Sequence, residues 1–350
     1  MGEYKLSNIT IKEIAQISGV SVGTVDRVLH NRGKVKKEKA ELVLEICRRE
    51  GYEPNLLARA MMMRKKNLRV AVIINNPGKN LFSEQVKDGL EAVLKEWKDY
   101  NVAFEYFYLY DRGAEEELEY LEQISSDETG YDGLIIKPVN DQRIRTQLAD
   151  MQNNGMPIVT CTSNLDGFEP LCFVGQNLVK EGRMAANMLL KCIPDIHEVA
   201  ILSIKKIIFA RIQRSDSFTK YLKQARKDIC VHKMIEYQET AEEVYAQTLE
   251  TLQAYPKTEA LYAHTRHLGA VHQAVLEQKR EKDLVVFSFG SKEYLKEYIQ
   301  AGKITFAIEE TSYGHGYYAG REILNYLLTG NLPEEKNHYI PSNILIEESF

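Results

Sequence analysis

The chain has 350 residues, and its 44% hydrophobic and 27% charged residues are the composition of an ordinary globular protein of two or three domains. No run of 18 or more apolar residues occurs, and the polar start from Met1 to Leu6 lacks the apolar stretch of a secretory signal, so neither a membrane span nor export is expected. The five cysteines are scattered without a CxxC pair, which argues against a metal site and for a cytoplasmic location.

Charge is unevenly distributed along the chain. Residues 1–66 carry 14 Lys and Arg against 8 Asp and Glu, whereas the remaining residues carry 31 against 42. A basic head on an acidic body is typical of a phosphate-binding module joined to a domain that does not bind nucleic acid. Charge alone leaves chance clustering of surface residues as an equal alternative.

Three short helices are predicted in the first fifty residues. The stretch that begins at Thr10 has the Thr-x-x-Glu spacing of a capping box, and Gly19 has the place of a helix-ending glycine. Ser21 is placed to cap a second helix over 22–29. A third helix is expected over 37–50, with these residues directed inward: Leu42, Val43, Ile46 and Cys47. Two short helices joined through Gly19 form a helix-turn-helix, whose second helix enters the major groove of DNA.

Two segments of the head carry a family resemblance. Residues 10–33, TIKEIAQISGVSVGTVDRVLHNRG, resemble the start of lactose-repressor (LacI/GalR) family regulators, and residues 51–60, GYEPNLLARA, are similar to the beginning of that family's hinge. The resemblance implies a DNA-binding domain over 1–54, a hinge helix over 55–66 and an effector-binding core over 67–350. It also implies these DNA contacts: Thr10, Ser21, Val22, Gly23, Thr24, Arg27, Asn31, Arg32, Asn55, Ala58, Arg59 and Met61.

Four of these positions have a particular role in the family. Val22 and Gly23 fall at its two main base-reading positions, although Val22 can offer only an apolar contact to a thymine methyl and Gly23 has no side chain. The alternative is that they are merely the first residues of a helix. Arg27 falls at a base- or phosphate-contacting position. Met61 falls where the family inserts an apolar side chain into the minor groove, and the alternative for it is an ordinary packing stripe of methionines.

From Leu68 onward, predicted strands alternate with predicted helices. The strands are expected over 68–74, 103–110, 132–138, 156–161, 171–174, 198–204, 231–235, 260–263 and 284–287, and the first three intervening helices over 82–97, 114–124 and 142–153. This alternation predicts βαβ units in two doubly wound parallel sheets. The fold class is therefore an all-α helix-turn-helix head with an α/β core, and the resemblance implies that the core is periplasmic-binding-protein-like.

The two expected lobes exchange segments of the chain. The N-lobe is expected to comprise about 67–169 and 305–332, and the C-lobe about 170–304 and 333–350, with the second run of βαβ units beginning at 171–174. The resemblance implies three crossovers between the lobes, which we expect near 170, near 303–311 and near 332–339. Parallel sheets bind ligands at the carboxyl ends of their strands, so residues at these ends are the candidate effector contacts. The candidates are Asn80, Phe82, Asp111, Lys137, Thr162, Asn164, Arg214, His264, Gly290 and Glu310.

Arg214 is the candidate that the resemblance supports best. The stretch from Arg214 to Phe218 resembles the family's Arg-x-x-Gly-aromatic motif, whose Arg grips ligand hydroxyls or a carboxylate. The alternative for Arg214 is a salt bridge on a helix, and for His264 a paired histidine on a loop. Three places in the core depart from the family: Gly290 replaces an Asp that often holds sugar hydroxyls, His264 and Thr265 stand where Asn-Asp is usual, and Glu310 replaces a Gln.

These features predict a ligand-responsive, DNA-binding transcription regulator, and the resemblance favours a repressor. The expected partners are a second copy of the chain, a pseudo-palindromic operator in double-stranded DNA, and a carbohydrate or related polar metabolite as effector. The alternatives are a sugar-binding protein without a role in transcription, an enzyme built on the same two-lobe core, and an architectural DNA-binding protein. No catalytic residue or cofactor is expected, because no motif of a nucleotide-binding or hydrolytic enzyme is found.

Overall fold

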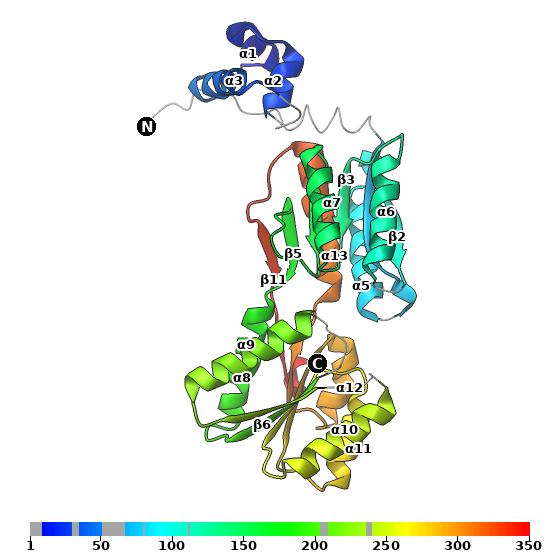
Figure 1. The fold of residues 1–350 in the computed structure, drawn as a ribbon, viewed down its shortest axis with the longest axis vertical. Coiled ribbons are helices and arrows are strands. Elements are labelled where there is room, and N and C mark those ends of the chain that lie inside the picture. The colour runs from blue at the N-terminus through cyan, green and yellow to red at the C-terminus, as the bar shows by residue number, and fades with distance from the viewer. Residues whose placement is uncertain are drawn as a thin grey trace. The chain divides into compact units, whose positions relative to one another are not determined.

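The computed structural model describes residues 9–29, 35–50, 67–79, 81–110, 113–203, 209–235 and 240–350 (Figure 1). The chain divides into two units, of which unit 1 comprises residues 1–173 and 316–338, and unit 2 comprises residues 174–315 and 339–350. Each unit contains one six-stranded, mainly parallel sheet. Within the described ranges, no helix combines the length and the apolar character that a membrane span requires.

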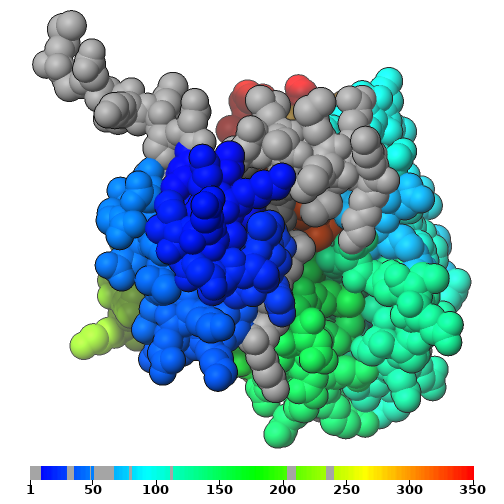
Figure 2. Space-filling model, turned by 90° about the horizontal axis from the view of Figure 1, so that it is seen from above, coloured from blue at the N-terminus to red at the C-terminus, as the bar shows by residue number. Residues whose placement is uncertain are grey.

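The head consists of three helices, as predicted: α1 (Ile11–Ser18), α2 (Val22–Leu29) and α3 (Lys37–Arg49). Their buried residues form one small core: Ile14, Ala15, Val25, Val43, Ile46 and Cys47. In the space-filling view the head helices appear in blue (Figure 2). The prediction that Leu42 points inward is wrong, because its side chain is 43% exposed. Residues 43, 46 and 47 share one helix face, and Leu42 lies about a quarter-turn away from it.

The sheet of unit 1 has the strand order β11-β5-β4-β3-β1-β2. Its strands are β1 (Leu68–Asn75), β2 (Val102–Leu109), β3 (Gly133–Ile136), β4 (Ile158–Cys161), β5 (Cys172–Gln176) and β11 (Asn337–Ile340). Its helices are α5 (Leu81–Glu96), α6 (Ala114–Ser126), α7 (Gln142–Asn153) and α13 (Ser312–Thr329). Buried residues of α6 and α7 pack on one face of the sheet. The run Val70–Ile74 in β1 is almost completely buried, as expected for a central parallel strand.

The sheet of unit 2 has the order β12-β10-β9-β8-β6-β7. Its strands are β6 (Glu198–Ser203), β7 (Cys230–Ile235), β8 (Ala260–Ala263), β9 (Val285–Gly290), β10 (Phe306–Glu309) and β12 (Ile344–Leu345). Its helices are α8 (Leu178–Cys192), α9 (Phe209–Ala225), α10 (Ala241–Ala254), α11 (Leu268–Glu277) and α12 (Lys292–Gln300). One apolar cluster joins α8 and α9 to the sheet, and another joins α10, α11 and α12 to it. Single 3₁₀ turns occupy Pro77–Lys79, Lys98–Tyr100 and Glu347–Ser349.

The expected division of the lobes needs correction. Residues 170–173 and 333–338 belong to unit 1, and residues 305–315 belong to unit 2. The strand near 171–174, expected to begin the second run of βαβ units, is β5 of the first sheet. The segment around 306–309, expected to be part of a crossover, is strand β10 and pairs in parallel with β9. Both errors have one cause, because a short apolar run does not reveal which sheet it will join.

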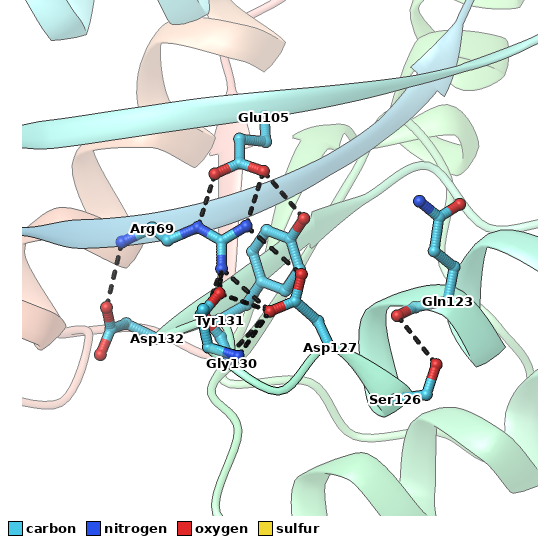
Figure 3. A network of polar contacts seen from close by, with 9 residues as sticks. Arg69, Glu105, Gln123, Ser126, Asp127, Gly130, Tyr131 and Asp132 are labelled. Atoms are coloured by element: carbon cyan, nitrogen blue, oxygen red, sulfur yellow. Dashed lines mark hydrogen bonds and ion pairs between the residues drawn. The ribbon is translucent and has the colours of Figure 1, made fainter.

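The side chain of Arg69 holds the first strand of the core, β1, to neighbouring segments through hydrogen bonds and ion pairs (Figure 3). The guanidinium donates from Nε to Oε1 of Glu105 in β2 (2.6 Å) and from Nη1 to Oδ1 of Asp127, in the loop after α6 (3.1 Å). The backbone nitrogen of Arg69 donates to Oδ2 of Asp132 (3.0 Å), and its guanidinium carbon lies 4.3 Å from the ring centre of Tyr131. The network fixes the start of β1 against β2 and against the loop that leads into β3.

Candidate functional site

The turn between α1 and α2 has the geometry that its residues predict. Thr10 caps α1, because its Oγ1 accepts a hydrogen bond from the Glu13 nitrogen while Glu13 Oε2 accepts from the Thr10 nitrogen (2.7 Å). Gly19 ends α1 with a φ of 65°. Ser21 Oγ then accepts from the nitrogen of Thr24 at the start of α2 (3.2 Å). These caps fix the angle at which α2 leaves the turn and leave its first residues exposed.

The exposed beginning of α2 contains the two predicted base-reading positions. Val22 is 46% exposed, and Ser21, Gly23 and Arg27 are also exposed. A Cβ added to Gly23 would meet no described atom within 4 Å, and its φ is not positive, so nothing described in the head requires glycine here. Glycine in a helix costs about 1 kcal/mol relative to alanine. Glycine at position 23 thus lowers the stability of α2, and the described packing of the head gives no reason for its presence.

The other predicted DNA contacts fall into two groups. Thr10 is exposed, but its hydroxyl and its nitrogen are both engaged with Glu13 in the cap. Arg27 donates from Nε to the carbonyl oxygen of Gly23 one turn earlier (2.9 Å), so its side chain lies along the face that begins at Gly23. The following predictions lie outside the described residues: Asn31, Arg32, Asn55, Ala58, Arg59 and Met61.

In unit 1, three of the six predicted effector contacts lie together at the carboxyl edge of the sheet. Lys137 follows β3, and Thr162 and Asn164 follow β4, which pairs with β3 in parallel. Thr162 has a φ of 69°, a conformation rare for a residue with a side chain, and Asn164 Oδ1 accepts a hydrogen bond from Thr160 Oγ1 (3.1 Å). Phe82 is partly buried on α5, and Asn80 and Asp111 lie outside the described residues.

A buried carboxyl that sequence reasoning missed lies beside this edge. Glu117 in α6 is 0% exposed, and its Oε2 accepts a hydrogen bond from the nitrogen of Val139 in the loop after β3 (3.0 Å). Burial raises the pKa of Glu117 to about 8, although the Val139 nitrogen and the charge of Lys137 act in the opposite direction. Its neutral form therefore predominates in the folded protein at pH 7.

In unit 2, the predicted contacts meet in one ion network. Arg214 in α9 is 4% exposed, and its Nε donates to Oε2 of Glu181 in the first turn of α8 (2.6 Å). Its Nη1 donates to Oε1 of Glu310, directly after β10 (2.5 Å). Burial alone would lower the pKa of Arg214, but Glu310 and Glu181 raise it above its usual value. The predicted alternative of a salt bridge for Arg214 is therefore realised, but inside unit 2 rather than on its surface.

Gly182 explains why α8 and α9 can bring Glu181 to Arg214. A Cβ at position 182 would lie 2.3 Å from the carbonyl oxygen of Arg214 and 2.9 Å from the nitrogen of Phe218. Only glycine allows the two helix backbones to approach this closely. Glu181 is fully buried, and its Oε1 accepts a hydrogen bond from Oγ of Ser342 (2.7 Å). Both carboxylate oxygens of Glu181 are thus engaged, which matches its ionised form, although burial raises its pKa.

Aromatic and imidazole rings surround the guanidinium of Arg214. The ring centre of Phe289 in β9 lies 5.1 Å from its central carbon, and the imidazole of His264, directly after β8, lies 5.4 Å from Phe289. His264 Nε2 is 3.7 Å from Oε1 of Glu310. Burial, with Arg211 and Arg214 nearby, lowers the pKa of His264 well below its usual value, so its ring is neutral at pH 7. His264 lies in the loop after β8, as its alternative interpretation required, but its side chain is buried beside Phe289 and Glu310.

The network contains residues that sequence reasoning had missed as well as residues it had named. Arg214, His264 and Glu310 are joined as described, and Gly290 is adjacent because its carbonyl oxygen accepts from the nitrogen of Glu310 (2.8 Å). The missed members are Glu181 and Ser342. The sequence contained a signal for Glu181. It lies four residues before Ala185 and eight before Leu189, so a carboxyl group falls on the otherwise apolar stripe of α8. Ser342 is reached only through the fold and had no such signal.

Two family patterns match the chain. Residues 10–55 match "Bacterial regulatory proteins, lacI family", and residues 70–331, most of the chain, match "Periplasmic binding protein domain". The chain belongs to the lacI family of bacterial regulatory proteins. Its core is a periplasmic binding protein domain, so the predicted combination of a helix-turn-helix head and a two-sheet α/β core is confirmed.

Curated members of the lacI family match parts of the chain. Catabolite control protein A of Priestia megaterium is 30% identical over 156 residues, which are 45% of this chain and 44% of that protein. The NTD biosynthesis operon regulator of Bacillus subtilis is 34% identical over 134 residues, 38% of each chain. The matched stretches thus span less than half the length of these relatives.

Solved structures resemble this lacI-family chain over a larger part of its length. A glucose-galactose binding protein from Geobacillus stearothermophilus covers 81% of this chain and 99% of its own, with a TM-score of 0.69 and 18% identity. A putative LacI transcriptional regulator from Bacteroides fragilis covers 81% and 98%, with a TM-score of 0.70 and 16% identity. At these identities the likeness establishes the fold of the core.

Proposed function

We propose that the protein is a ligand-responsive transcription regulator, and specifically a repressor, whose head binds an operator in duplex DNA. Two copies would place two α2 helices in successive major grooves of a pseudo-palindromic site. A small polyhydroxylated metabolite bound at the carboxyl edge of a core sheet would change the affinity for DNA. Since its partner is chromosomal DNA, we place the protein in the cytoplasm.

The observation that carries the DNA-binding part is the exposed start of α2. Gly23 destabilises the helix by about 1 kcal/mol relative to alanine and has no described packing neighbour that demands it. A residue without a side chain at this point lets the helix backbone approach another surface closely. The hydroxyl of Ser21 and the amides at the start of α2 are suited to a phosphate, and Arg27 on the same face is suited to a base edge or a phosphate.

The ligand-binding part rests on the ends of the strands. In each sheet the polar side chains gather at the carboxyl edge, Lys137, Thr162 and Asn164 in unit 1 and His264 and Glu310 in unit 2. A protein that only bends DNA has no use for such a set, whereas an effector domain or a solute-binding protein does. The lacI-type head favours the effector domain over the solute-binding protein.

The test begins with selection of duplexes from a random library by the full-length protein. Affinity for the selected duplex, measured by fluorescence anisotropy, is expected to fall on the order of 10³-fold between 50 and 200 mM salt. Arg27→Ala should weaken binding by about 1–3 kcal/mol if the side chain contacts a base. Arg49→Ala is the matched control, because Arg49 is an exposed arginine on α3 whose ion pair is with its neighbour Glu50 (2.8 Å).

Three results would count against the proposal. If selection enriched no sequence, with or without a panel of sugars, the protein would not be an operator-binding regulator. If Arg27→Ala and Arg49→Ala weakened binding equally, the loss would reflect net charge alone, and α2 would not be the reading helix. Specific binding to DNA that no metabolite altered would favour an architectural protein.

A further inference from the structure

The charges of the ion network in unit 2 are not equally accessible. The side chain of Arg214 is 5% exposed and that of Glu181 is 0% exposed, whereas the side chain of Glu310 is 18% exposed. The guanidinium already donates to both carboxylates. A ligand that arrives at this edge of the sheet therefore meets the carboxylate of Glu310 before it can reach Arg214.

A second carboxylate stands next to Glu310. Glu309 is partly exposed at the end of β10, and its Oε2 accepts a hydrogen bond from Nδ2 of Asn343 (2.7 Å). His264, the nearest ring to Glu310, is neutral and contributes no positive charge. Arg211, one turn before Arg214 on α9, is partly exposed, and its charge acts on His264 and Tyr262. Among Arg214, Glu181 and Glu310, however, the most accessible charge is the negative one of Glu310.

Two deeply buried polar atoms beside this network lack a protein partner among the described residues. The hydroxyl of Tyr262 belongs to a residue 1% exposed, and Nδ1 of His264 to a residue 9% exposed. Both side chains lie in the electrostatic field of Arg214, and that of Tyr262 also in the fields of Glu310 and Glu181. Buried polar atoms are normally satisfied, so two orphans at one place indicate a polar molecule that binds there.

We propose that Glu310 is the specificity-determining residue of the effector site, and that the effector is a polyhydroxylated compound with a protonated amino group, which that carboxylate receives. The inference rests on the proposed effector role of this edge of unit 2. Arg214 is then a positioning residue, because its guanidinium holds Glu310 and Glu181 in place and does not grip the ligand. Phe289, which already faces the guanidinium, supplies an aromatic face that tolerates a second cation nearby.

The physical basis is a charge-assisted hydrogen bond. An ammonium brought to Glu310 replaces the water on a partly buried carboxylate and donates to an acceptor fixed by Arg214. The hydroxyls of the same ligand can satisfy Tyr262 and His264. An anionic sugar, with a carboxylate or a phosphate, would be placed against the carboxylate of Glu310 and would have to displace it from Arg214 before it gained a partner.

The experiment compares matched triplets of ligands by thermal shift and titration calorimetry on the full-length protein without DNA. Each triplet contains a neutral hexose, its 2-amino form and its uronic acid, with gluco, galacto and manno members. We expect the amino sugar of at least one triplet to bind at least about 10-fold more tightly than its neutral parent, as a charge-assisted bond would give. The uronic acid should bind least.

A protein variant supplies the second readout. Glu310→Gln keeps an acceptor for hydroxyls and removes the charge, so the preference for the amino sugar over its parent should fall to near one. Glu309→Gln is the matched control and should keep most of the preference. If Glu310→Gln fails to fold, because Arg214 loses a partner, the ligand triplets still decide the question without it.

The outcomes are distinct. Tightest binding of a uronic acid would overturn the proposal and point to Arg211 or Arg214 as an anion handle, and tightest binding of the neutral parents, or no binding by any triplet, would overturn it as well. Full retention of the amino preference in Glu310→Gln would reassign the contact. Because the assay contains no DNA, these results are independent of whether the head binds an operator.

Discussion

The buried carboxyl of Glu117 makes the stability of unit 1 depend on pH. The residue is 0% exposed, one oxygen accepts a hydrogen bond from the Val139 nitrogen at 3.0 Å, and the other has no partner among the residues described. Burial raises its pKa from 4.5 to about 8. We predict that Glu117→Gln removes most of this pH dependence, because Gln keeps the acceptor for Val139 and does not titrate.

The sign follows from the raised pKa. The protonated carboxyl favours the folded state fully below pH 4.5, and this contribution is lost as the pH rises toward about 8, since the unfolded chain has already released its proton. At pH 7 the folding free energy lost is roughly 3 kcal/mol, because each pH unit above 4.5 costs about 1.4 kcal/mol. The stability of Glu117→Gln relative to the parent should therefore rise by roughly that amount between pH 4.5 and 7.

Urea unfolding at several pH values measures this difference. Trp97 is the only tryptophan of the chain and lies in unit 1, so its fluorescence reports on the unit that contains Glu117. Glu119→Gln, which changes an exposed carboxyl on the same helix, is the control and should follow the parent at every pH. If Glu117→Gln showed the same pH dependence as the parent protein, the buried neutral carboxyl would not exist and the reasoning would fail.

Three further predictions follow from single contacts. Gly182→Ala should destabilise unit 2 by about 1–3 kcal/mol and abolish ligand binding, because its Cβ would lie 2.3 Å from the Arg214 carbonyl; an unchanged melting temperature would refute the close approach of α8 and α9. Val25→Ala, in the core of the head, should cost about 2 kcal/mol and abolish DNA binding while calorimetry shows the melting of the core unchanged; a fully active variant would contradict this. Tyr262→Phe removes an unpartnered hydroxyl and should leave the ligand-free protein at least as stable, yet weaken ligand binding; a clear loss of stability without ligand would reveal a missed partner.

The sequence predicted the parts of the fold that depend on local pattern. Thr10 and Gly19 marked the ends of α1 correctly, and the boundaries expected for α7 are those observed. Strand β10 was missed as a strand because a run of three apolar residues carries no period, and its identity depends on the pairing with β9. Leu42 was placed inward although it is exposed, because a helix with many apolar residues allows more than one inner face.

The candidate site was predicted less completely than the fold. Arg214 was found through its resemblance to a family motif, Glu310 through a crossover position where the family often has Gln, and His264 through its place after a strand. Glu181, the partner of Arg214, comes from a segment distant in the chain, and only the contact of α8 with α9 brings the two together. Ser342, which donates to Glu181, comes from a third segment, between β11 and β12. A local pattern shows which residue types are present. It does not show that two helices approach each other closely enough to pair them.

The central claim is that a metabolite bound to the core changes the grip of the head on DNA. A linkage cycle tests it most directly: the affinity for the selected duplex is measured with and without a bound ligand, and the affinity for that ligand with and without the duplex. The account predicts that the ligand changes the affinity for DNA by the same factor as DNA changes the affinity for the ligand, and that this factor differs from one, since coupling between two sites is reciprocal. A ligand that binds the core tightly while both factors equal one would contradict it.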